Sequence, residues 1–120
     1  MSEFHETIVA KILAAPSGGT ASLVGLVLPT TGYWVGHGKL GFTAPAPAVT
    51  RPFLLDALQY IRSIRGVGHV GWWTDAGRFY IEPSTWHVDY RLAYAQAEER
   101  GELAFFDIGR GQDVRLRRAA

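Results

Sequence analysis

The stretch Val67–Asp89, VGHVGWWTDAGRFYIEPSTWHVD, decides the fold of this protein. Two runs of β-favouring residues flank a turn sequence at Thr74–Gly77, in which Gly77 supplies the positive φ that a tight turn requires. The segment therefore predicts a β-hairpin that carries three of the chain's four tryptophans. Pro83 is expected to limit how far the second strand pairs, because proline has no backbone N–H.

Side chains alternate between the two faces of a strand, so Trp72 and Trp73 lie on opposite faces of this hairpin, as do Phe79 and Tyr80. We expect Trp72 and Phe79 to be buried beneath helices, which leaves Trp73 and Tyr80 on the other face. Tryptophan and tyrosine are enriched at protein interfaces. The candidate partner-binding residues are therefore Trp34, Trp73, Tyr80 and Trp86. The alternative for these rings is ordinary core and cross-strand packing.

Two helices flank the hairpin. The first is expected over 50–65, where Thr50 caps its start, Pro52 suits its first turn and Gly66 stops it. The second is expected over 90–100, after the capping residue Asp89.

The remaining segments are shorter. Residues 3–15 have helical spacing of apolar residues, but β-branched Thr7 and its neighbours leave a strand open as well. Strands are predicted at 22–29, 33–36, 103–108 and 114–116, and the continuous apolar run 22–29 is expected to be buried on both faces. Glycines make 36–41 a flexible connection, and Ala44–Pro47 is an extended linker.

These elements predict the fold class. The chain is expected to be a single α+β domain over 1–120: a two-layer structure in which two or three helices pack on one face of a mostly antiparallel sheet. Its 120 residues, with 48% hydrophobic and 19% charged content, suit one globular core. The other face of the sheet must be solvated or covered by a partner.

The composition of the chain excludes several classes of function. The absence of cysteine excludes disulfides, thiolate metal sites and cysteine nucleophiles. A net charge of +1 gives no argument for a strong nucleic-acid binder. No apolar run reaches the roughly 20 residues that span a bilayer, and the N-terminus carries Glu3 and Glu6 instead of a basic region. We expect a cytoplasmic protein without a membrane partner.

No motif of an enzyme is present. His69, His87 and Asp89 could hold a metal or act as acid and base, but the sequence lacks a recognised ligand spacing. Ser84 is not in a Gly-x-Ser-x-Gly elbow, and Gly36–Lys39 lacks the spacing of a phosphate-binding loop. We therefore expect a non-enzymatic protein with no cofactor and no metal, and a small metal-dependent hydrolase is the least favoured alternative.

Basic residues gather near the C-terminus and suggest another alternative. Arginines there could contact nucleic-acid phosphates while neighbouring aromatic rings stack on bases. The nucleic-acid-binding candidates are Arg110, Arg115, Arg117 and Arg118. Asp107 and Asp113 weaken the local positive field, so a solvated tail is the competing interpretation.

A short block at 31–36, TGYWVG, resembles part of small uncharacterised proteins encoded by actinobacterial phages and related integrated elements. The second half resembles them too, at 73–75, 79–84, the alanine-rich helix, 101–108 and 111–113. The resemblance covers about half of the chain and includes no catalytic signature, so it transfers no functional residue. It implies a phage accessory protein that acts on a host factor or host defence. Together with the aromatic hairpin, it predicts a protein that binds a protein partner, or a second copy of itself as a homodimer, through an aromatic sheet surface.

Overall fold

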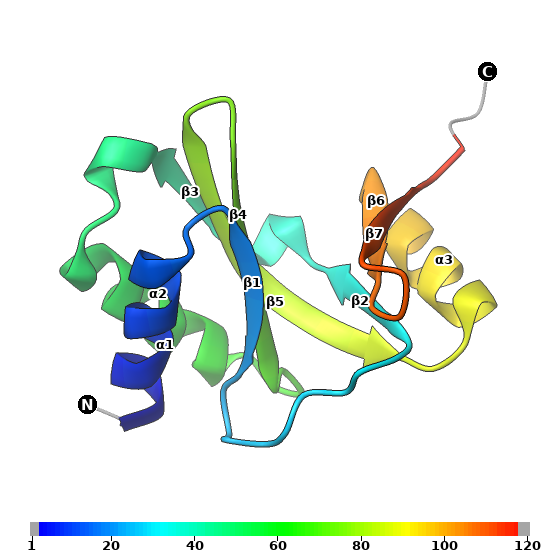
Figure 1. Ribbon diagram of the computed structural model, residues 1–120, viewed down its shortest axis with the longest axis horizontal. Helices are drawn as coiled ribbons and strands as arrows, with labels where there is room; N and C mark the ends of the chain where they lie inside the picture. The colour runs from blue at the N-terminus through cyan, green and yellow to red at the C-terminus, as the bar shows by residue number, and fades with distance from the viewer. Residues whose placement is uncertain (1–2, 118–120) are drawn as a thin grey trace.

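The computed structural model describes residues 3–117, with side chains from residue 5 onward. In chain order the elements are α1 (Glu3–Ala14), β1 (Gly18–Ser22), β2 (Tyr33–Gly36), the 3-10 turn η1 (Gly38–Leu40), β3 (Phe42–Pro45), the 3-10 turn η2 (Ala46–Ala48), α2 (Arg51–Ser63), β4 (His69–Asp75), β5 (Arg78–His87), α3 (Tyr90–Glu99), β6 (Ala104–Asp107) and β7 (Gln112–Arg115) (Figure 1). The N-terminal segment, for which the sequence allowed either a helix or a strand, is helical.

The predicted α+β class is confirmed, because helices pack against one antiparallel sheet. The strand order is β1-β4-β5-β2-β6-β7, and β3 pairs with part of β5. Strand β5 is the longest and organises the sheet. One of its edges pairs with β4, and its other edge pairs first with β3 and then with β2. The side chains of β5 therefore meet those of three neighbouring strands.

The predicted hairpin is β4–β5. Asp75 pairs with Arg78, and the two residues between them, Ala76 and Gly77, both have positive φ, at 50° and 78°. Positive φ at both central positions is the signature of a type I′ turn, whose twist matches that of the strands.

The expected limit at Pro83 is wrong, because β5 continues to His87 and pairs with β4 as far as Ser84. The carbonyl of Pro83 accepts a hydrogen bond from the backbone N–H of His37. The N and O atoms of a strand residue point to the same edge, so the missing N–H of Pro83 faces away from β4. The β4–β5 ladder loses no hydrogen bond.

Both predicted helices that flank the hairpin are present, with the expected caps. The hydroxyl oxygen of Thr50 accepts from the N–H of Phe53, and the carboxylate of Asp89 accepts from the N–H groups of Arg91 and Leu92. These bonds satisfy N–H groups that have no partner inside the helix. Helix α2 begins and ends within two residues of the predicted limits.

The helices lie on one face of the sheet. Against α1 and α2 this face presents the buried side chains of Val70, Trp72, Phe79 and Ile81. Against α3 the same face presents Val35 and Phe105. Val35 belongs to this face because it pairs with Thr85, which lies an even number of residues from Phe79 along β5. Figure 1 shows α1 and α2 at the β1 and β4 side of the sheet and α3 beside β6. The predicted burial of Trp72 and Phe79 is confirmed.

Two apolar segments differ from prediction. The run 22–29 is not a buried strand: β1 ends at Ser22, and in the loop that follows Val27 is 96% exposed. The hydroxyl of Ser22 accepts from the N–H groups of Val24 and Leu26, and this local turn competes with strand pairing. In α1, the helical spacing of apolar residues over 3–15 includes Leu13, but this side chain is exposed, one position beyond the fully buried Ile12.

Candidate functional site

The sheet face opposite the helices, called the open face below, is crossed at its centre by the Gly36–Gly41 connection and carries the ring pair Trp73 and Tyr80 towards one end. These residues are direct cross-strand partners on β4 and β5. Their ring centroids lie 5.1 Å apart with the planes 11° from parallel, and Trp73 is 36% exposed. The structure therefore places both on the face that was expected to need cover.

A second group of rings lies at the other end of this open face. Trp34 pairs with Trp86 on one side and Phe106 on the other. Trp86 is exposed, and its indole N–H donates to the carbonyl of Thr31 at 2.8 Å. Phe106 is also exposed and was missed, although alternation from the buried Phe105 would have found it.

The expectation that Trp34 is a surface ring is wrong. Only 7% of it is exposed, and its ring packs against His69 with centroids 4.8 Å apart. Strand β2 lies between β5 and β6, so neighbouring side chains from both strands cover the indole. The open face thus has exposed rings at its two ends and a buried ring between Trp86 and Phe106.

Between these two groups lies a buried carboxyl group, that of Glu82, which sequence reasoning did not select. Glu82 is 6% exposed. The segment Gly36–Gly41 passes so close that a Cβ on Gly41 would lie 2.7 Å from the Cβ of Glu82, and a Cβ on Gly36 would lie 1.8 Å from its Oε1. The glycines expected to make a flexible connection instead allow close approach, and residues 38–40 form a 3-10 turn.

Glu102 brings a second carboxyl group to the same place. Its Oε1 lies 3.3 Å from the position that a Cβ on Gly36 would occupy, and its Oε2 accepts from the N–H of Gly38 at 3.3 Å. Within residues 3–117, no hydrogen bond reaches the carboxyl group of Glu82. Strand alternation places Glu82 on the same face of β5 as Tyr80. Nothing in the sequence indicated that Glu102 lies next to it.

Arg100 lies beside this carboxyl pair, but its hydrogen bonds go elsewhere. Its Nη1 donates to the carbonyl of Val35 at 3.1 Å, to that of Gly36 at 3.4 Å and to Oγ1 of Thr85 at 3.0 Å. Burial, with the charge of Glu102 in addition, raises the pKa of Glu82 to about 8 against the opposing effect of Arg100. Glu82 is therefore mostly protonated at neutral pH.

The pKa of Glu102 is also raised. Burial is the main cause, and the N–H of Gly38 and the charges of Arg100 and Lys39 oppose it. The two carboxyl groups therefore form a coupled pair in which ionisation of one disfavours ionisation of the other.

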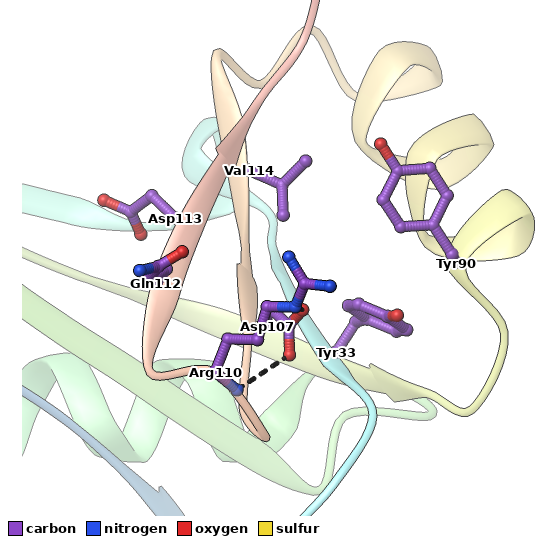
Figure 2. Close-up of a pocket in the computed structure, with 7 residues that line it drawn as sticks. All are labelled: Tyr33, Tyr90, Asp107, Arg110, Gln112, Asp113 and Val114. Carbon is purple, nitrogen blue, oxygen red and sulfur yellow. Dashed lines mark hydrogen bonds and ion pairs between the residues drawn. The ribbon is translucent and has the colours of Figure 1, made fainter.

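A separate pocket of about 360 Å³ lies on the helix side, between the start of α3 and the β6–β7 turn (Figure 2). It is lined by Tyr33, Tyr90, Asp107, Arg110, Gln112, Asp113 and Val114. The backbone N–H of Arg110 donates to Asp107 at 3.1 Å. The rings of Tyr33 and Tyr90 touch edge to face, with centroids 5.7 Å apart, so they leave no slot for a flat ligand between them.

The four candidate arginines do not form one surface. Arg110 lines the pocket on the helix side. Arg115 lies on the open face, because it pairs with Ala104, which is two residues from Phe106 on β6. Arg117 is exposed and its backbone N–H donates to the hydroxyl of Tyr94. Arg118 lies outside the described residues.

The histidine and aspartate candidates do not converge either. His69 packs on Trp34 on the open face, and His87 lies on the helix face with its Nε2 2.8 Å from Oγ1 of Thr85. The carboxylate of Asp89 caps α3. In the part of the chain that the structure describes, no three His, Asp or Glu side chains are grouped so that they could hold a metal ion.

The fold and this face define an α+β protein whose open sheet face carries exposed rings at both ends and a buried carboxyl pair between them. No protein-family model, curated protein or solved structure matches the chain. Among residues 3–117, the helices are too short or too polar to cross a membrane.

Proposed function

We propose that this protein is a non-enzymatic binding protein that docks a protein partner on its open sheet face, with Trp73 and Tyr80 as the main anchors. The observation that carries the proposal is their parallel stacking on the open face, where Trp73 is exposed and Tyr80 is half-buried. Each ring holds the other in place, so a partner gains a large rigid surface with little loss of side-chain entropy.

The second group of rings extends this docking surface. Trp86 and Phe106 are exposed on the same face. Exposed aromatic residues within a polar surround are typical of interface anchors. The resemblance to actinobacterial phage proteins favours a host protein as the partner, and the cytoplasm of the host cell as the place of binding.

The test is capture of a partner by matched variants. The tagged protein and its Trp73→Ala and Tyr80→Ala variants are exposed to host lysate, and the retained proteins are identified and quantified by mass spectrometry. Tyr60→Ala is the control, because Tyr60 is exposed and packs edge to face on Phe42, away from the open face. A protein retained by the wild type and by Tyr60→Ala but lost from both hairpin variants supports the proposal. Equal retention by all four contradicts it.

Self-association is the other form of protein binding that an open aromatic face allows. Light scattering over a range of concentrations distinguishes it. A mass that doubles with concentration, and does so for Tyr60→Ala but not for Trp73→Ala, makes a second copy the partner. A monomer at every concentration removes the homodimer.

Nucleic-acid binding by the arginines remains an alternative with less support, because Arg110 and Arg115 lie on opposite faces of the β6–β7 hairpin. It predicts binding that weakens steeply with salt. Fluorescence anisotropy with labelled single- and double-stranded DNA at low salt tests it. A metal-dependent hydrolase has the least support, since His69, His87 and Asp89 are engaged in separate places.

A further inference from the structure

We propose that the outer edge of β1 is a dimerisation surface, where β1 of a second copy of this chain pairs antiparallel about a two-fold axis through Thr20. The pairing joins two sheets into one. The inference goes beyond the proposed function, because it uses the edge of the sheet and leaves the open face of each copy free for a partner. The surface consists mainly of backbone groups, and none of the candidate partner-binding residues lies on β1.

The first support is the unpaired backbone on the outer edge of β1. The N–H of Leu23, next to the end of this strand, donates to the carbonyl of Gly68 at 2.8 Å. Every second residue of an antiparallel ladder bonds its partner strand in this way, and the residues between direct their N–H and C=O groups to the opposite edge. Thr20 and Ser22 are such residues. Nothing in the described range 3–117 bonds their outward backbone groups.

The second support is that β1 lacks the protection of the other sheet edges. Native proteins block free edges with prolines and charged side chains. The same alternation makes Thr43 and Pro45 the outward residues of β3, and Asp113 and Arg115 those of β7. Pro45 offers no N–H, and the two charges on β7 oppose pairing with another strand. The sequence of β1, Gly-Gly-Thr-Ala-Ser, has neither a proline nor a charge.

The pattern of donors and acceptors on β1 fits a copy of itself. When two β1 strands run antiparallel with Thr20 opposite Thr20, the two threonines exchange both of their backbone bonds. The N–H of each Ser22 then donates to the carbonyl of Gly18 in the other copy. The N–H of Gly18 already donates to the carbonyl of Ala15 at 3.4 Å. Every outward donor of β1 therefore has an acceptor, and the side chains at the axis form a favourable threonine pair.

Exposed apolar side chains at the two ends of β1 favour a second copy as the occupant. Leu13 lies before β1, in the last turn of α1, and Val24, Leu26 and Val27 lie in the loop after it; all four are exposed. Figure 1 shows the connection from α1 and this loop at opposite ends of β1. A two-fold axis brings the start of one β1 next to the end of the other. It therefore moves Leu13 of one copy towards the apolar loop of the other, out of contact with water.

The experiment measures the mass of the full chain by light scattering over a range of concentrations, for the wild type, Thr20→Pro and Thr20→Val. Proline removes the outward N–H of residue 20 in both copies and no bond to β4, whereas valine keeps that N–H. We expect dimers from the wild type and Thr20→Val, and association about 30-fold weaker from Thr20→Pro, through loss of two hydrogen bonds. A wild type that is a monomer at every concentration, or a dimer unchanged by Thr20→Pro, overturns the proposal.

Charge variants test the register, and they do not require proline to fit into β1. Thr20→Lys and Thr20→Glu each place like charges opposite one another across the axis, so each alone should weaken the dimer. An equimolar mixture should form a mixed dimer, detected by native mass spectrometry, because opposite charges then face each other. Thr43→Lys and Thr43→Glu, on the outer edge of β3, are the matched controls and should each dimerise as the wild type does. No preference for the mixed dimer at position 20 overturns the proposal.

Trp73→Ala separates this dimer from binding on the open face. Two sheets that met face to face on their rings would lose the dimer with Trp73→Ala, whereas pairing along β1 should survive it. A dimer lost with Trp73→Ala but not with Thr20→Pro would overturn pairing along β1 and leave docking on the open face. A dimer that depends on Thr20, in a protein whose capture of partners ignores Trp73→Ala, would sink the proposed function alone.

Discussion

The backbone of Gly41 lies against the carbonyl oxygen of Ile81, so closely that a Cβ at position 41 would come within 2.5 Å of that oxygen. The contact joins the connection between β2 and β3 to the middle of β5, directly over Glu82. It is made by backbone atoms, which cannot swing aside as the end of a long side chain can. This relationship gives the most direct test of how the carboxyl pair is enclosed.

Gly41→Ala should therefore lower the free energy of unfolding by about 3 kcal/mol, because the added methyl group forces the connection away from β5. Urea denaturation measures the change. Gly68→Ala is the matched control: a Cβ there meets nothing within 4 Å, so its effect should stay within about 0.5 kcal/mol. A loss at position 41 no greater than that at position 68 would contradict the close approach.

Glu82 makes stability depend on pH. Its pKa of about 8 in the folded state lies above the ordinary value of 4.5, so between these two values the folded protein binds more protons than the unfolded chain. Stability should be greatest below about pH 4.5 as far as this group is concerned, and should fall as pH rises through 8. The full loss amounts to about 5 kcal/mol.

Glu82→Gln keeps the shape but carries no charge, so its free energy of unfolding should not show that decline between pH 5 and pH 9. Urea denaturation at each pH measures it. The exposed Glu98→Gln variant should decline with pH as the wild type does. Parallel profiles for the wild type and Glu82→Gln would count against a raised pKa at Glu82.

The two adjacent tryptophans of β4 should differ sharply in their contribution to stability. Trp72 is buried, and its indole N–H donates to the carbonyl of Ala15 at 2.9 Å, whereas Trp73 lies on the open face. Trp72→Ala should cost about 4 kcal/mol, and Trp73→Ala about 1 kcal/mol through loss of its stacking on Tyr80. Thermal and urea unfolding of the two variants compare them. Equal losses would mean that the faces of the hairpin are wrongly assigned.

His5 is buried in α1, and neither of its ring nitrogens has a hydrogen-bond partner among residues 3–117. His5→Leu should raise the free energy of unfolding by about 1 kcal/mol at pH 7. Burial, together with Arg62 and the N-terminal amino group, lowers the pKa of His5. The wild type should therefore lose stability as pH falls below 6.5, and the gain from leucine should be larger at pH 5 than at pH 8.

Lys11→Leu on the same helix is the control for that gain, since Lys11 is exposed. It adds an apolar side chain without removing a buried polar group. A similar gain in both variants, or a gain from His5→Leu that does not grow at low pH, would argue against the assigned cause.

Ala76 has a φ of 50° in the β4–β5 turn, a conformation that asparagine tolerates better than alanine. Ala76→Asn should raise the melting temperature through a gain of about 0.5–1 kcal/mol. Ala76→Val should lower it, because a β-branched side chain opposes positive φ. Calorimetry of the pair measures the difference, and the reverse order would exclude a type I′ turn.

Local chemistry explains the parts of the fold that could be predicted. Thr50 and Asp89 mark two helix starts because their side chains bond backbone N–H groups a few residues away. Gly77 marks the hairpin because its φ is a property of one residue. The period of two places Trp72 and Trp73 on opposite faces without knowledge of any partner strand. Each of these inferences concerns neighbours in sequence.

Two of the failures concern groups that are distant in sequence, and a third concerns a local turn. The burial of Trp34 depends on β5 and β6 on either side of it, and strand order was not predictable. The continuation of β5 past Pro83 depends on His37, which occupies the edge where the proline N–H is missing. The apolar run 22–29 fits a strand by composition, but hydrogen bonds to Ser22 turn the chain away from the sheet.

The sequence by itself thus determined the class of the fold, the helix ends, the hairpin and the faces of its rings, because periodicity, capping and turn conformation act over a few residues. Only the tertiary structure decided which rings stay exposed and that Glu82 meets Glu102. These two glutamates approach each other because a connection of glycines crosses β5 and the segment after α3 returns to it. Their raised pKa values arise from that burial, a property of the assembled chain and of neither residue alone.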